Sequence, residues 1–131
     1  MQATSKQNLI QEALAAQKRA VAPYSKFQVG AALLTVDGVI IRGANVESAS
    51  YGLTCCAERV ALFKALTEGH SSFKAIAVVA PMGGGATPCG ACRQLLAEYA
   101  PKAKVWVADS RKPLKVTGYS VQELLPVSFQ F

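Results

Sequence analysis

Helical and extended segments alternate along this sequence in an order that favours a layered α/β fold. Apolar residues recur at helical spacing through residues 5–21, and Pro23 follows that run. Residues 27–36 and 39–41 are rich in apolar and β-branched side chains, and Asp37-Gly38 between them is a two-residue hairpin signal. The chain is therefore expected to begin with an amphipathic helix followed by a β-hairpin.

The alternation continues along the rest of the sequence. Further helices are predicted at 56–68, 90–100 and 121–125, and further strands at 73–80, 105–107 and 114–117. Gly69 is expected to cap the C-terminus of the first of these helices. The order αββαβαβ predicts a central mixed sheet with helices on its faces. Because the 131 residues are 51% hydrophobic and 17% charged, they are expected to form a single domain over 1–131.

Two short cysteine motifs point to a metal. Cys56-Ala57-Glu58 begins one predicted helix, and the PCGAC motif with Cys89 and Cys92 begins another. The unpaired N–H groups and the positive dipole at a helix N-terminus favour thiolate, the form that zinc requires. The sequence therefore predicts one zinc ion per chain bound by Cys56, Cys89 and Cys92. Its fourth tetrahedral position is left open, as in catalytic zinc sites.

Two other residues could bind the metal but fit less well. Cys55 adjoins Cys56, and neighbouring side chains diverge, so Cys55 is expected to be a small buried residue. His70 is the only histidine and follows the presumed end of a helix, where a surface or capping position is expected. Disulfides are not expected, because a cytosolic chain with a C-x-x-C pair more often uses its thiols for metal or redox chemistry.

Glu58 and Arg59 follow the first predicted ligand. Residues two apart on a helix point away from each other, so Glu58 reaches the metal only if the ion lies over the helix end. Glu58 is then placed to shuttle protons; the alternative is a carboxylate that complements the helix dipole. Three thiolates and one Zn²⁺ sum to a charge of −1 by simple counting. Arg59 is placed to donate to a thiolate and offset that charge, the alternative being a surface arginine.

Charge and hydropathy argue against nucleic-acid and membrane partners. The net charge of +6 would suit a polyanionic partner, but the basic residues are scattered, with a modest cluster only at 111–115. No stretch approaches the roughly 20 apolar residues that span a bilayer, and the first residues lack a secretory pattern. The glycines at 83–85 lack a phosphate-loop pattern and are expected to form a flexible connection. We therefore expect a cytoplasmic protein with neither a nucleic-acid nor a membrane partner.

Three sequence blocks occur in order across nearly the whole chain. They are PYSKFQVGAA at 23–32, NVE at 45–47 followed by CAER at 56–59, and PCGACRQ at 88–94. With these blocks the sequence resembles a cytidine deaminase of the small homotetrameric, zinc-dependent type. The resemblance implies a three-layer α-β-α sandwich with a central mixed five-stranded sheet. It also implies hydrolysis of cytidine and deoxycytidine to the uridines and ammonia, a reaction of pyrimidine salvage.

The resemblance assigns substrate contacts as well. It implies that Phe27 packs against the base, that Ala57 contacts the pyrimidine through its backbone, and that Asn45 and Glu47 hold the ribose hydroxyls. Phe129 is implied to reach the active site of a neighbouring subunit, and Glu58 to carry protons from the attacking water to ring N3 and the leaving amine. Apart from the resemblance, Phe27 could be ordinary strand core and Asn45 a turn residue.

Three competing functions remain open at this point. The chain could deaminate a base in a nucleic acid, a free base or a nucleotide, although relatives of that kind commonly have histidine where this chain has Cys56. It could act on a nucleoside antibiotic, although the block from Phe27 onward favours plain cytidine. In a different class, the cysteines could hold a structural zinc in a basic RNA-binding module.

Overall fold

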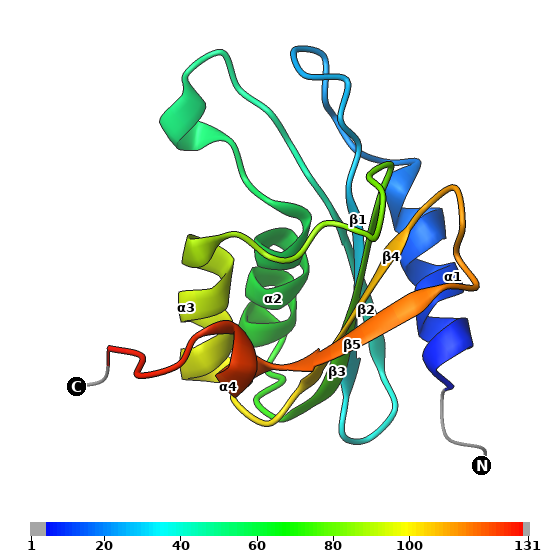
Figure 1. Ribbon diagram of the computed structural model, residues 1–131. Helices are drawn as coiled ribbons and strands as arrows, with labels where there is room; N and C mark the ends of the chain where they lie inside the picture. The colour runs from blue at the N-terminus through cyan, green and yellow to red at the C-terminus, as the bar shows by residue number, and fades with distance from the viewer. Residues whose placement is uncertain (1–4, 130–131) are drawn as a thin grey trace.

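A five-stranded mixed sheet forms the centre of the molecule in the computed structural model, which describes residues 5–129 (Figure 1). Its strands are β1 (Gly30–Thr35), β2 (Ile40–Ala44), β3 (Phe73–Ala80), β4 (Lys104–Asp109) and β5 (Val116–Ser120). They lie in the order β2-β1-β3-β4-β5. Only β3 and β4 pair in parallel among these strands, and the other neighbours are antiparallel.

Helices cover both faces of this sheet. On one face lies α1 (Lys6–Gln17), and on the other lie α2 (Ala57–Thr67) and α3 (Gly90–Tyr99), as Figure 1 shows. A short helix, α4 (Val121–Leu124), follows β5, and a 3₁₀ turn, η1 (Tyr51–Leu53), lies in the segment before α2. The expected three-layer α-β-α sandwich is confirmed.

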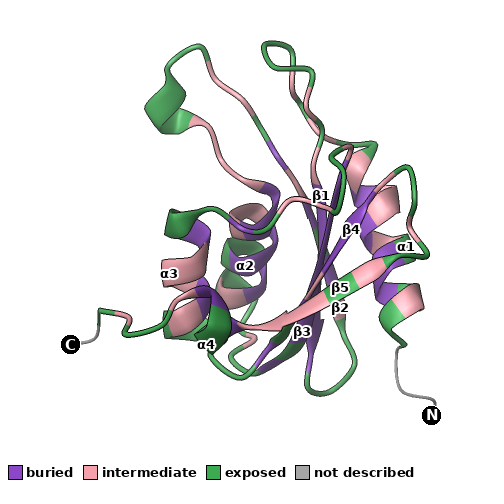
Figure 2. Ribbon diagram, viewed as in Figure 1, coloured by how far each residue is buried: buried purple, intermediate pink, exposed green. Residues whose placement is uncertain are grey.

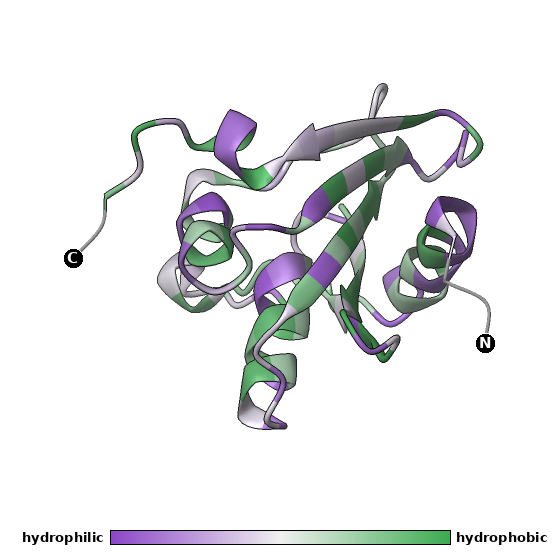
Figure 3. Cartoon of the chain, turned by 90° about the horizontal axis from the view of Figure 1, so that it is seen from below, coloured by the Kyte–Doolittle hydropathy of each residue, from purple (hydrophilic) through white to green (hydrophobic). Residues whose placement is uncertain are grey.

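Each face of the sheet has its own apolar core. The core under α2 and α3 contains Leu33, Ile76 and Val105, whereas the core under α1 contains Ile10 and Val79. Buried residues accordingly concentrate in the central strands and on the inner sides of the helices (Figure 2). The same strands carry much of the hydrophobic sequence in Figure 3. Because helices cover both faces of the sheet, side chains on both faces of β3 are buried. Its sequence is therefore almost continuously apolar and does not alternate between apolar and polar residues.

The predicted elements are present, with some shifted boundaries. The hairpin is confirmed: β1 and β2 are antiparallel, and Gly38 in the turn has φ +94°. The first helix ends at Gln17 and not at about residue 21 as predicted, because Val21 forms a β-bridge with Val46. The strand predicted at 114–117 is wrong by a few residues, since β5 occupies Val116–Ser120. The order αββαβαβ also omits β5 and α4, which follow β4.

Gly43 on β2 sets how closely α2 approaches the sheet. A Cβ at this position would lie 2.5 Å from the Ala57 carbonyl oxygen and 2.5 Å from the Ala61 nitrogen. Only glycine permits that approach, so the first turn of α2 rests directly on the strand backbone. This contact fixes the start of α2, where Cys56 lies.

Within residues 5–129, none of the helices combines the length and apolar character that crossing a membrane requires.

Candidate metal centre and active site

Two helix N-termini converge on the α2 and α3 side of the sheet. Cys56 is the N-cap residue of α2 and Cys89 is the N-cap residue of α3, both with extended backbone conformation. Neither side chain caps its own helix through a hydrogen bond. The two sulfurs are therefore available to a ligand while the first-turn N–H groups and the helix dipoles favour their ionised form.

The three predicted ligands come together as a compact sulfur cluster. Cys56 Sγ lies 3.7 Å from Cys89 Sγ, and Cys89 Sγ lies 3.5 Å from Cys92 Sγ. All three sulfurs lie within 4.8 Å of one another. Tetrahedral zinc with Zn–S bonds of about 2.3 Å places its sulfurs about 3.8 Å apart, so the spacing and the donor type fit zinc.

The protonation of the cluster is uneven. Hydrogen bonds, first from the Cys92 thiol and then from Arg59 and Cys89, lower the pKa of Cys56 to about 5. The pKa of Cys92 is raised, mainly because its thiol donates to the Cys56 sulfur and secondly because it is buried. Three sulfurs at this spacing ionise together only when a cation compensates them, which is a further reason why the site suits a divalent metal.

Arg59 lies where the sequence predicts it. Its guanidinium Nη2 is 3.4 Å from Cys56 Sγ and 3.3 Å from the Thr54 carbonyl oxygen. The contact with Cys56 is the main reason why the pKa of Arg59 is raised. The guanidinium thus stabilises a thiolate and also ties the start of α2 to the preceding segment.

Glu58 is a buried carboxylate beside the cluster. Only 6% of the residue is exposed, and it lines the same cavity as Cys56 and Cys89. Burial is the main reason why the pKa of Glu58 is raised to about 7. A carboxyl group with a pKa near neutrality can both accept and return a proton, which a solvated helix-dipole carboxylate does less well.

Cys55 and His70 stay outside the sulfur cluster. Cys55 is partly exposed, not fully buried as expected, because its backbone pairs with Val46 in the loop segment before α2. Burial nevertheless raises the pKa of its thiol. His70 follows Gly69, whose φ of +96° is the left-handed conformation expected after the end of α2.

A cavity of about 230 Å³ opens beside the cluster. Phe27, Asn45 and Ala57 line it together with Glu58, as the resemblance implies. The Asn45 side chain accepts a hydrogen bond from the Val29 N–H at 2.8 Å and donates one to the Phe27 carbonyl oxygen at 2.9 Å. Asn45 thereby holds the segment that presents Phe27 to the cavity. This positioning contact has no signal in the sequence apart from the amide itself.

Glu47 lies in an adjoining cavity of about 410 Å³ that shares Thr54 with the first. Its carboxylate accepts hydrogen bonds from the backbone N–H groups of Tyr24 and Ser25, each at 3.1 Å, and from the Ser25 hydroxyl. The Ser25 hydroxyl is the main reason why the pKa of Glu47 is lowered. Glu47 therefore joins the PYS block at 23–25 to the NVE block at 45–47.

Phe129 lies apart from the cavity of its own chain. It is 68% exposed, and its carbonyl oxygen accepts a hydrogen bond from Gln94 Nε2 at 3.4 Å. Residues of the cavity wall come from elsewhere in the described chain. The structure thus places the backbone of Phe129 beside Gln94 of α3, and most of the residue is exposed.

Arg93 has a role that the residue pattern alone did not suggest. Its guanidinium donates to the Pro88 carbonyl oxygen at 2.7 Å, to the Thr87 hydroxyl at 2.9 Å and to the Leu124 carbonyl oxygen at 2.9 Å. These bonds connect the loop before Cys89 with α4. The only advance signal was the position of Arg93 directly after the second cysteine of PCGAC.

Comparison with known proteins agrees with this geometry. The model of the cytidine and deoxycytidylate deaminase zinc-binding region matches residues 3–108. The chain belongs to this deaminase family. A cytidine deaminase from Halalkalibacterium halodurans is 54% identical over 125 residues, which cover 95% of this chain and 93% of that protein. A cytidine deaminase from Sporosarcina psychrophila is 47% identical over 94% of this chain and 90% of its own length.

The fold comparison supports the same family. A crystal structure of cytidine deaminase from Burkholderia pseudomallei superposes with a TM-score of 0.91 at 48% identity. The match covers 95% of this chain and 99% of that one. The resemblance to cytidine deaminases inferred from the three sequence blocks is thus confirmed over 95% of the chain.

Proposed function

We propose that this chain hydrolyses the exocyclic amino group of cytidine and deoxycytidine, giving the uridines and ammonia, and so serves pyrimidine salvage. The observation that carries the proposal is the cluster of three cysteine sulfurs within 4.8 Å of one another, beside a cavity that the buried Glu58 also lines. The relatives named cytidine deaminase support the choice of substrate.

Zinc bound by Cys56, Cys89 and Cys92 would supply a Lewis acid that lowers the pKa of a water toward neutrality. Glu58 accepts the proton that the attacking water loses and passes it to ring N3. It then accepts the proton of the new C4 hydroxyl and passes it to the leaving amine, so that ammonia departs and the ring keeps a C4 carbonyl. The positive guanidinium of Arg59 lies beside the Cys56 sulfur. Its charge offsets that of the thiolates, so that they do not cancel the electric field of the metal at the reacting water.

Substrate recognition would rely on residues around the same cavity. Phe27 offers a flat apolar surface to the base, and the backbone of Ala57 lies beside the pyrimidine. Each polar atom of the Asn45 amide has one bonding position left after its contacts with Val29 and Phe27. Those positions suit a ribose hydroxyl, and Glu47 in the adjoining cavity would accept from a second one.

We further propose that the protein is a cytoplasmic homotetramer in which Phe129 completes the nucleoside site of a neighbouring subunit. Phe129 is a largely exposed residue and is not among the residues that line the cavity of its own chain, which supports this arrangement. Each chain is proposed to act as a single deaminase domain over 1–131.

An ultraviolet assay of parallel substrates tests the function. Cytidine, deoxycytidine, cytosine, CMP, a cytosine-containing nucleoside antibiotic and a short single-stranded RNA should be compared on one preparation, with zinc and ammonia measured alongside. We expect turnover of both nucleosides and about one zinc per chain. Bound zinc without ammonia release from any cytosine compound would instead favour a structural metal in a binding module.

A further inference from the structure

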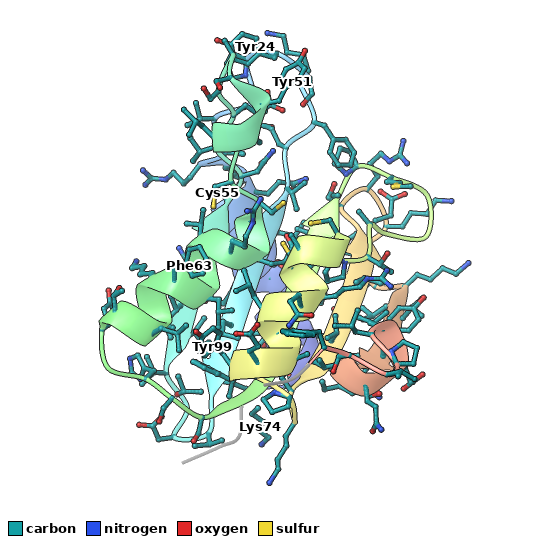
Figure 4. All side chains as sticks on the ribbon, turned by 90° about the vertical axis from the view of Figure 1, so that its left-hand side faces the viewer. Tyr24, Tyr51, Cys55, Phe63, Lys74 and Tyr99 are labelled. Atoms are coloured by element: carbon teal, nitrogen blue, oxygen red, sulfur yellow. The ribbon has the colours of Figure 1, made fainter. Side chains whose placement is uncertain are left out.

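A second hollow lies on the α1 face of the sheet, away from the sulfur cluster. Its volume is about 180 Å³, and it is lined by Lys6, Lys74, Lys104 and Trp106 among others. Lys6 comes from the start of α1, Lys74 from β3, and Lys104 and Trp106 from β4. In Figure 4, Lys74 lies at the end of the molecule opposite to Cys55. The hollow is thus a separate site and not an extension of the catalytic cavity.

Trp106 forms a fixed apolar wall of this hollow. It pairs across the sheet with Gly118, where a Cβ would lie 2.4 Å and 2.8 Å from two carbon atoms of the indole. Gly118 therefore permits the ring to lie directly on the strand backbone. The Lys6 ammonium is 5.2 Å from the ring centroid and the Lys104 ammonium is 5.3 Å from it. These cation–π contacts hold two positive charges beside one ring.

The positive charges around the hollow form no close ion pair with a carboxylate. Among residues 5–129, ion pairs form at Arg42 and Arg111 but at none of the three lysines. The pKa of Glu123 is lowered, first by its hydrogen bonds with Ser120 and to a smaller extent by the charge of nearby Lys104. The Glu123 carboxylate also closes the capping box of α4, where it accepts from the Ser120 N–H at 3.0 Å. Three lysines near one such carboxylate leave an excess of positive charge around the hollow, which complements an anion.

We propose that this hollow binds the diphosphate group of a small phosphorylated ligand. The three lysines supply a charge of about +3 at pH 7, whereas a phosphate monoester carries about −1.5 to −2. A diphosphate group balances the lysines more fully. The hollow also lies at the start of α1, where Ser5 and Lys6 line it. The Ser5 hydroxyl already accepts the Asn8 N–H, and the first-turn N–H groups before Asn8 add donors at the rim.

The indole provides a direct readout, because Trp106 is the single tryptophan in the sequence. Fluorescence of the zinc-loaded full chain should be titrated with pyrophosphate, with orthophosphate, and with adenosine diphosphate, which has no cytosine for the catalytic cavity. We expect a saturable change with pyrophosphate that tightens at low salt. Lys74→Ala should weaken binding about two- to fivefold, and the double variant Lys6→Ala/Lys104→Ala about tenfold or more. Tighter binding of the nucleotide would identify a nucleoside diphosphate as the source of the group.

Lys64→Ala provides the matched control, since this lysine lies in the last turn of α2 on the other face. It should leave pyrophosphate affinity within about twofold of the unmodified chain. Calorimetry repeats the titrations without relying on the indole, and cytidine turnover shows that each variant is folded. The proposal is overturned by an absence of saturable pyrophosphate binding, by orthophosphate binding equally well, or by an equal loss in Lys64→Ala. Single-stranded RNA that binds here without competition from pyrophosphate would also overturn it.

Discussion

Replacing Glu58 by glutamine separates the catalytic role of this residue from a structural one. Glutamine has nearly the same shape, so the buried position can accept it without a cavity. The amide cannot take a proton from water and return it to the base. General acid–base catalysis contributes about 10² to 10⁴ in rate, and a residue that serves several transfers should cost at least the upper end. We therefore expect turnover to fall about 10⁴-fold while zinc content and nucleoside binding persist.

The assay is cytidine turnover followed in the ultraviolet, together with zinc analysis and thermal unfolding on the same samples. Glu68→Gln is the matched control, because it removes a carboxylate from the C-cap end of the same helix. If Glu58 only complemented the helix dipole, its loss would change the free energy of unfolding by about 0.3 to 1 kcal/mol and leave activity intact. Zinc-replete Glu58→Gln protein that turns over cytidine within about tenfold of the unmodified rate would refute the proton-shuttle role.

Four further experiments test the site and the packing around it. Cys92→Ala should lose zinc, as measured by metal analysis, whereas Cys55→Ala should keep it; the reverse pattern would move the ligand assignment. Arg59→Ala should retain zinc but lower turnover about ten- to a hundredfold and shift its pH profile, since a charge-assisted hydrogen bond is worth about 1.5 to 3 kcal/mol; unchanged kinetics would make Arg59 structural only. Gly43→Ala should lower the free energy of unfolding by about 1 to 3 kcal/mol in a denaturant titration, and an unchanged midpoint would contradict the close packing of α2. Truncation before Phe129 should raise the KM for cytidine in a folded protein, and a full-length chain that is active as a monomer on a sizing column would refute the shared site.

Local sequence patterns correctly predicted those helices and strands whose own apolar residues form a continuous buried run. The helix over 56–68 and the strand over 73–80 agree with α2 and β3 because periodicity and flanking breakers coincide there. Weaker patterns gave poorer boundaries. The segment at 114–117 was displaced from β5 because an edge strand that is only partly buried has little hydrophobic alternation to mark it. The 3₁₀ turn η1 was missed for the same reason, since none of its residues is buried.

The spacing of residues along the sequence was enough to predict the site residues, but their contacts with one another depend on the fold. The sequence could place Cys89 and Cys92 on one helix face, but only the packing of α2 against β2 brings Cys56 to them. In the same way, the asparagine of the NVE block was assigned to substrate, whereas its amide also fixes the backbone around Phe27. Contacts of that kind join segments distant in sequence, and no local pattern encodes them.

The electrostatic balance of the metal centre follows from where its ligands begin their helices. Three thiolates with Zn²⁺ sum to −1, which by itself would weaken the acidification of a water. Arg59 brings +1 to the Cys56 sulfur, and each helix N-terminus is equivalent to about +0.5. The cysteines that start α2 and α3 therefore place their charge where two backbone dipoles and one guanidinium offset it. Glu58 is buried beside this centre, so its proton affinity responds to that balance, and this coupling is why Arg59→Ala should alter the pH profile without removing the metal.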